Sequence, residues 1–187
     1  MLERPPAAPA ISLRPIALGD AEAVAVLRTA SRDLLSRWEP DEDDTSYTLA
    51  GVRDAIEAAL ARTAAGTGRS YVILDRGRPV GGLLLNSIVQ GPYIRTCSVG
   101  YWVAAAETGR GIATEAVRLA KTVAFEELGL DQVRAETLPD NLASQKVLAR
   151  NGFRRLGLTP CYSLATGRLR DHVLFEAPNP RSEPRWN

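Results

Sequence analysis

The sequence predicts an α/β fold of the α+β type, in which a mixed, mostly antiparallel sheet of seven strands is flanked by four helices. Three observations lead to this prediction. The chain has 187 residues, the usual length of one domain. Hydrophobic residues make up 45% of it and charged residues 24%, as is typical of globular proteins. Segments with strand and helix periodicity follow one another in the order β-α-α-β-β-β-α-β-α-β-β, so an antiparallel sheet precedes a single βαβ crossover.

The first third of the chain is expected to form one strand and two helices. Apolar and polar residues alternate over residues 11–15, which predicts a strand. A helix with Asp20 as its cap follows and ends at Trp38-Glu39-Pro40, because proline disfavours helix at the residue before it. Residues 41–44 are acidic and should form a solvated loop. Apolar residues at helical spacing then predict a second helix over about residues 48–63.

The rest of the domain alternates between strands and helices. Strands over residues 70–75 and 79–87 flank a hairpin turn at Asp75-Arg76-Gly77-Arg78. The remaining elements, in order, are a strand over 96–103, a helix from the glycine turn at 109–111 to about 128, a strand over 132–137, a helix over 141–150, and two strands over 153–164 and 168–176 that turn at 165–167.

Composition limits the domain count and the class of function. Residues 1–10 and 177–187 are proline-rich and are expected to be flexible tails around one domain, residues 11–176. Lys and Arg total 23 against 22 Asp and Glu, whereas a general nucleic-acid binder is usually far more basic. No apolar run approaches the ~20 residues that span a membrane, and the N-terminus lacks the apolar stretch of a signal peptide, so we expect a cytoplasmic protein.

Cysteine and histidine usage argues against a metal site. Cys97 and Cys161 stand apart without a CxxC motif, and His172 is the only histidine. Two idle thiols in a reducing compartment are therefore the expectation, and no metal ligand set is predicted.

One segment has the pattern of a phosphate-binding turn. A strand over residues 96–103 leads to Gly109-Arg110-Gly111, which opens a helix. The first N–H groups of a helix lack partners within it and carry the positive end of its dipole, and glycine lets a phosphate approach them. An ordinary strand–helix turn is the alternative. A Rossmann fingerprint would need a third glycine where Thr114 stands, and no Gly-Lys-Ser/Thr of a P-loop occurs.

A second segment follows about thirty residues later. Asn141 stands where a helix N-cap belongs, Ser144 lies three residues further on, and Gly152 follows the helix. A simple capped amphipathic helix is the alternative interpretation of this segment.

Together, and in this order, the two segments resemble the acetyl-CoA site of the Gcn5-related N-acetyltransferases (GNAT). The family motif Gln/Arg-x-x-Gly-x-Gly/Ala falls on residues 108–113, with Thr108 in place of Gln/Arg. The resemblance extends over roughly residues 11–176 and implies the GNAT fold. The cofactor-binding residues that it implies are Trp102, Val103, Ala104, Thr108, Gly109, Arg110, Gly111, Ile112, Ala113, Thr114, Asn141 and Ser144.

Further motifs resemble the RimJ/RimL branch of this family. They are Trp38-Glu39-Pro40, Gly91-Pro92-Tyr93, Gly100-Tyr101-Trp102, Thr114-Glu115-Ala116, Asn141-x-x-Ser144, Gly152-Phe153 and Gly167-Arg168-Leu169-Arg170-Asp171-His172. The Trp-Glu-Pro and Arg-Asp-His pieces are most similar to RimJ-type alanine N-acetyltransferases. The resemblance implies acetyl transfer from acetyl-CoA to the N-terminal amine of a ribosomal protein, with a possible ribosome contact.

The resemblance also suggests which residues perform the chemistry. A backbone N–H near Val103 would stabilise the thioester oxygen. Many family members protonate the departing thiolate with a tyrosine on the helix after the asparagine, but Ala149 lies about there in this chain, so Ser144 is the candidate. A role for Ser144 in stabilising the helix start alone is equally open. Glu136 is the candidate base, and the other candidates are Glu107, Asp171 and His172.

The acceptor side is expected to involve Trp38, Glu39 and Tyr93, and the acidic run over residues 39–44 could attract a cationic acceptor. An α-amine has a pKa of about 8, so freeing it at pH 7 costs only ~1 kcal/mol, whereas a lysine amine costs ~4–5 kcal/mol. A site without a strong base therefore favours an N-terminal amine. The alternatives are an acetyltransferase for a small cationic amine, and a CoA-binding, ribosome-associated factor without catalysis.

Overall fold

The computed structural model describes residues 10–39, 44–165 and 168–182. In this part of the chain the predicted class is confirmed: seven strands form one sheet in the order β1-β2-β3-β4-β5-β7-β6. The acidic residues 41–43 and the turn residues 166–167 lie outside the described residues. The strands are β1 Ile11–Pro15, β2 Arg69–Asp75, β3 Arg78–Gln90, β4 Arg95–Val103, β5 Gln132–Thr137, β6 Arg154–Ala165 and β7 Arg168–Pro178.

Every neighbouring pair of strands is antiparallel except β4 and β5, which are parallel because a helix crosses over between them. The α-helices are α1 Ala21–Ala30, α2 Arg32–Leu35, α3 Leu49–Ala64, α4 Ile112–Thr122 and α5 Leu142–Arg150. A π-helical segment, Val123–Glu127, continues α4. Short 3-10 turns are Leu18–Asp20, Asp44–Tyr47 and Ala105–Glu107.

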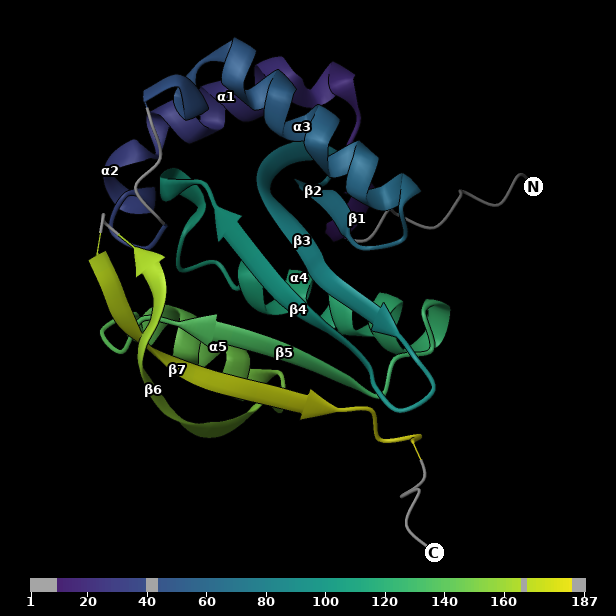
Figure 1. The fold of residues 1–187 in the computed structure, drawn as a ribbon. Helices are drawn as coiled ribbons and strands as arrows, with labels where there is room; N and C mark the ends of the chain where they lie inside the picture. Colours follow the sequence, from purple (N-terminus) through teal and green to yellow (C-terminus); the bar gives the residue numbers. More distant parts are fainter. Residues whose placement is uncertain (1–9, 40–43, 166–167, 183–187) are drawn as a thin grey trace, which may run out of the picture.

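The helices lie in two layers on opposite faces of the sheet (Figure 1). Helices α1 and α3 cover β2 and β3, whereas α4 and α5 cover the other face. Side chains alternate along a strand, so the odd-numbered residues of β4 and β7 pack under α4 and α5, as the burial of Cys97, Val99, Val173 and Phe175 shows. The even-numbered residues face the other way, and Trp102 of β4 packs there against residues of α1 and α3.

The first predicted helix is divided into two, α1 and α2, so the described part of the chain holds five α-helices. The break falls at Ser31, which is 2% exposed and accepts a hydrogen bond from Ala105 N at 3.0 Å. Asp20 stands at the start of α1 but does not cap it through its side chain. Its carboxylate instead accepts from Ala17 N and from the Arg14 guanidinium.

The ordered chain continues past the predicted end of the domain at residue 176. Strand β7 extends to Pro178, Asn179 N donates to Asp131 O at 2.7 Å, and Ser182 Oγ donates to Asp131 Oδ1 at 2.7 Å. Ala177 and Pro178 therefore pair with β5, and Asn179 and Ser182 bond to Asp131 just before it.

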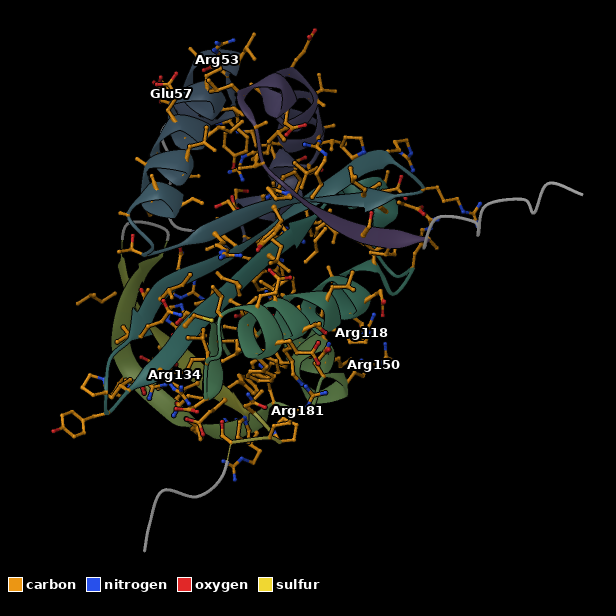
Figure 2. The ribbon with its side chains drawn as sticks, turned by 90° about the vertical axis from the view of Figure 1, so that its right-hand side faces the viewer. Arg53, Glu57, Arg118, Arg134, Arg150 and Arg181 are labelled. Carbon is orange, nitrogen blue, oxygen red and sulfur yellow. The ribbon has the colours of Figure 1, made fainter. Side chains whose placement is uncertain are left out.

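The charge of the chain is spread over its surface. The arginines labelled in Figure 2 lie exposed on α3, α4, α5, β5 and the segment after β7. No helix among the described residues is long and apolar enough to cross a membrane. Within the same residues, no three His, Cys, Asp or Glu side chains are grouped to hold a metal ion.

Candidate active site

Strands β4 and β5 diverge toward their C-terminal ends. They are paired only where Thr96–Ser98 meets Gln132–Arg134, although β4 runs on to Val103 and β5 to Thr137. Ala104 N donates to Val80 O on the β3 side at 2.9 Å. Successive N–H groups of an extended chain point to opposite edges, so Val103 N–H points into the opening. The prediction that a backbone N–H near Val103 stabilises the thioester oxygen therefore remains a proposal, with Val103 N–H as the group in question.

The glycine turn lies just beyond the end of β4. Gly109 and Gly111 have φ angles of 76° and 79°, in the region that favours glycine, and an added Cβ would meet nothing within 4 Å at either. Gly111 directly precedes the first turn of α4, whose backbone N–H groups have no partners within the helix. The turn is exposed from Thr108 to Gly111 and therefore fits a phosphate group of a ligand.

Arg110 is held by two carboxylates beside this turn. Its guanidinium bonds to Asp75 Oδ2 at 2.9 Å and to Glu107, which also accepts from Arg78 at 2.6 Å. The Arg78 and Arg110 guanidiniums lower the pKa of Glu107. The sequence implied a cofactor-binding role for Arg110 but gave no sign of this network, which ties the turn to the β2–β3 hairpin. Thr108 donates its hydroxyl to Ala105 O at 3.0 Å, within the turn.

Helix α5 faces the opening from the α4 side of the sheet. Asn141 caps it as predicted, with Oδ1 accepting from Ser144 N at 3.0 Å. Asn151 Nδ2 at its other end donates to Thr114 O at 3.1 Å and so joins α5 to the first turn of α4. Tyr101 Oη lies 3.0 Å from Ser144 Oγ. Burial raises the pKa of Tyr101 to about 12, against a smaller lowering by the Ser144 hydroxyl.

Glu136 lies on the opposite face of the sheet. Ala135 and Thr137 are buried, so Glu136 between them points away from α4 and α5, and Glu136 Oε1 accepts from Ser98 Oγ at 3.3 Å. Leu174 pairs with Glu136, which brings His172, two residues earlier on β7, to the same face. Nδ1 of His172 lies 3.0 Å from Arg170 O.

The other predicted bases are less suitable. Glu107 is bound by the Arg78 and Arg110 guanidiniums, which lower its pKa, so its carboxylate is a weaker base than a free one. Asp171 precedes His172 on β7, and its side chain is oriented to the other face by strand alternation.

Of the predicted acceptor-side residues, Glu39 is brought to the end of β4 through Arg28, and Trp38 precedes it in the chain, where its N–H donates to Leu35 O. Arg28 pairs with both carboxylate oxygens of Glu39, at 2.9 and 3.3 Å. Its guanidinium also lies over the rings of Tyr47 and Trp102, at 5.3 and 5.7 Å from their centroids. The sequence gives no sign that Arg28 holds these groups together. Its partners Glu39, Tyr47 and Trp102 lie on separate segments of the chain.

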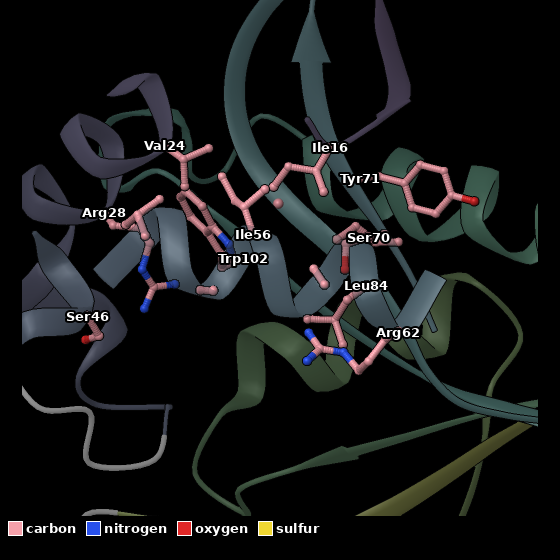
Figure 3. Close-up of a pocket in the computed structure, with 15 residues that line it drawn as sticks. Ile16, Val24, Arg28, Ser46, Ile56, Arg62, Ser70, Tyr71, Leu84 and Trp102 are labelled. Carbon is pink, nitrogen blue, oxygen red and sulfur yellow. The ribbon is translucent and has the colours of Figure 1, made fainter. Parts of the chain in front are cut away.

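A pocket of about 210 Å³ lies between α1, α3 and the sheet, on the same face as Glu136. Figure 3 shows Trp102 and Ile56 in its wall, with the Arg28 and Arg62 side chains at its two sides. Most of its lining is apolar, and the described residues that line it include no Asp or Glu.

Tyr93 is not brought to this site. It lies in the turn between β3 and β4 and is 96% exposed. Val103, at the open end, is ten residues further along an extended strand, roughly 30 Å away. The physical reason is that β4 is extended, so a residue just before its start lies far from a residue at its end.

The fold, with an exposed glycine turn before α4 and two strands that diverge beside it, defines a class of protein: an acetyltransferase of the GNAT type. The chain matches the acetyltransferase (GNAT) domain family over residues 11–154 and belongs to that family, in its RimJ/RimL-like branch. It uses acetyl-CoA, the acetyl donor of the family.

Its relatives include enzymes with an assigned acceptor. The chain is 32% identical over 175 residues to the probable N-acetyltransferase YjcK of Bacillus subtilis (strain 168), covering 92% of this chain and 96% of that one. It is 26% identical over 167 residues to the ribosomal protein uS5-alanine N-acetyltransferase of Escherichia coli (strain K12), covering 88% and 86%. The structure of Mycobacterium smegmatis RimJ in complex with CoA-disulfide matches with a TM-score of 0.86 and 32% identity, covering 90% of this chain and 81% of that one.

Proposed function

We propose that this acetyltransferase modifies the N-terminal α-amine of a protein, with a ribosomal protein that begins with alanine as the expected acceptor. The observation that carries the proposal is the placement of polar groups on the two faces of the β4–β5 opening. Glu136 stands on one face, and Ser144 with Tyr101 stands on the other. An amine can therefore approach from the Glu136 side while the sulfur of acetyl-CoA departs on the α5 side.

The residues of the chain would divide the reaction as follows. Acetyl-CoA supplies the activated acetyl group. The start of α4, from Gly109 to Thr114, binds its phosphates, and Val103 N–H donates to the thioester oxygen as negative charge develops there. Glu136 accepts the proton that the amine nitrogen sheds, directly or through water. Ser144 donates a hydrogen bond to the departing sulfur.

The pocket beside Trp102 favours a peptide over a small polycation. Its two charged lining residues are Arg28 and Arg62, which would repel an aminoglycoside or a polyamine. Glu39, the predicted attraction for a cation, is already paired with Arg28. The apolar walls suit a small apolar side chain such as that of an N-terminal alanine. The uS5-alanine acetyltransferase of Escherichia coli supports the same class of acceptor and, with it, a contact to the ribosome or its proteins.

Release of CoA over a panel of acceptors tests the proposal. The panel contains peptides that begin with Ala, Ser or Met, the same peptides with blocked α-amines and a free lysine, and spermidine and an aminoglycoside. We expect the highest kcat/KM with the Ala peptide and little activity with the blocked peptides. A higher kcat/KM with the blocked peptides or with the polyamines would overturn the proposal. CoA binding without turnover of any amine would favour the non-catalytic alternative.

A further inference from the structure

The phenol that faces Ser144 comes from the sheet and not from helix α5. Tyr101 Oη lies 3.0 Å from Ser144 Oγ and 3.4 Å from the Ser144 backbone oxygen. Tyr101 stands in the opened half of β4, two residues before Val103, and packs against the core under α4 and α5. Its side chain therefore reaches from one wall of the opening to the first turn of the helix that faces it.

The Tyr101 hydroxyl is able to donate a hydrogen bond to Ser144. Burial raises the pKa of Tyr101 to about 12, so the phenol keeps its proton throughout the physiological range. The shorter of its two contacts is to Ser144 Oγ, which can accept it. When Tyr101 donates to Oγ, the Ser144 proton must point away from the tyrosine. The Asn141 oxygen is already bonded to Ser144 N–H, which holds the first turn of α5 in place.

We propose that Tyr101 is a positioning residue for acetyl transfer: its hydroxyl donates to Ser144 Oγ and so directs the Ser144 proton toward the sulfur that departs in the opening. In that step the C–N bond forms and the C–S bond breaks. The electron pair of the broken bond stays on sulfur, which receives the hydrogen bond from Ser144. Glu136 takes the proton that the nitrogen sheds and returns it to solvent, and the CoA thiolate takes up a proton from solvent. The inference rests on the proposed role of Ser144, and it holds for any amine acceptor because the same thiolate departs.

A double-mutant cycle tests this coupling. Tyr101→Phe removes the hydroxyl and keeps the ring, so we expect kcat to fall about tenfold with the KM for acetyl-CoA unchanged. Ser144→Ala should lower kcat about a hundredfold. In the Ser144→Ala background, Tyr101→Phe should have no further effect, because the group that it orients is gone. A purely structural role of Tyr101 predicts that the two effects multiply, and that outcome overturns the proposal, as does a Tyr101→Phe variant with wild-type kcat.

Thr96→Val is the matched control. It removes another buried hydroxyl from the same strand, in the paired half of β4, where Thr96 Oγ1 has no hydrogen-bond partner in the described structure. Its kcat should equal that of the wild type. Thermal unfolding of each variant shows whether it folds, and a loss of kcat that follows only a loss of folding would count against the proposal.

A spectroscopic measurement separates this inference from the proposed acceptor. With tyrosine labelled at the ring carbon that bears oxygen, the Tyr101 resonance, assigned through Tyr101→Phe, should shift in Ser144→Ala. No shift would show that the contact is absent in solution and would overturn the proposal without any assay of activity. The kinetic cycle uses whichever amine proves to be an acceptor, so failure with N-terminal peptides would refute the proposed function alone.

Discussion

Strand β4 has two halves that meet β5 in different ways. In the paired half, Thr96–Ser98 bonds to β5, Cys97 and Val133 are each 1% exposed, and burial raises the pKa of the Cys97 thiol to about 12. In the opened half the same two strands separate, and the groups between and beside them are Val103 N–H, Tyr101 and Glu136. The same pair of strands thus forms an inert core at one end and a polar site at the other.

The opening is possible because each strand keeps its outer partner. Strand β4 stays bonded to β3 as far as Val103, and β5 stays bonded to β7 as far as Thr137. Only the shared edge loses its pairing, so the unpaired N–H groups remain in fixed positions. Fixed donors cost no reorganisation when charge develops, which is what a catalytic site requires.

Gly111→Trp should have the largest effect, a loss of acetyl-CoA binding, because it blocks the proposed phosphate-binding turn that follows the opened half of β4. The indole would occupy the open space at the start of α4, and we expect acetyl-CoA binding to weaken by more than about a hundredfold, measured by calorimetry. Gly77→Trp is the control, because Gly77 has a similar φ of 83° and equally open surroundings in the β2–β3 turn. Equal loss of binding in both variants would mean that strain, and not blockage, is responsible.

Glu136→Gln tests the acceptor face of the opened half. We expect kcat to fall about a hundredfold, the usual contribution of a general base, with the Kd for acetyl-CoA unchanged. Glu176→Gln is the control, since Glu176 lies on the same face opposite Arg134, beside the paired half. Steady-state kinetics and calorimetry measure the two quantities. Wild-type kcat for Glu136→Gln would exclude this carboxylate as the base.

Acid should destabilise the turn that follows the opened half. The pKa of folded Glu107 is below its usual value of 4.5, mainly because Arg78 and also Arg110 donate to it. The stability that this carboxylate contributes is therefore present above about pH 4.5 and is lost as the pH falls through the lower, folded pKa. Urea unfolding between pH 6 and pH 3 should show a shallower loss for Glu107→Gln. Glu57→Gln, on the exposed surface of α3, should follow the wild-type curve.

Thr96→Val should have the smallest effect, in the paired half. The buried Oγ1 has no hydrogen-bond partner among the described residues, so folding removes it from water without a compensating bond. A methyl group of similar shape in its place avoids that loss of hydration. We expect the free energy of unfolding to rise by about 1 kcal/mol, measured in urea. A decrease would indicate that Oγ1 is hydrogen-bonded in solution.

The elements of the fold could be predicted because their signals are local. Alternation placed β5 at Gln132–Thr137, and Asn141 followed by Ser144 placed the cap of α5. The break at Ser31 could not be predicted in this way, because the buried side chain there bonds to Ala105, 74 residues further along the chain.

The candidate site was predictable only in part, for the same reason. The glycine turn and the Val103 donor follow from one continuous segment. The pairing of Arg110 with Asp75, the contact of Arg28 with Glu39, and the meeting of Tyr101 with Ser144 each join segments that are distant in sequence. The motif that suggested Tyr93 could not reveal that this residue lies at the far end of its strand from the site.

The sequence by itself determined the fold class, the order of the strands and of the helices apart from the break at Ser31, the family and the donor acetyl-CoA, since these depend on periodicity and on motifs within short segments. Only the tertiary structure decided where β4 parts from β5, which face of the sheet Glu136 occupies, and which hydroxyl meets Ser144. The register of a sheet and the alternation of its side chains set these relations, and both depend on which strands become neighbours.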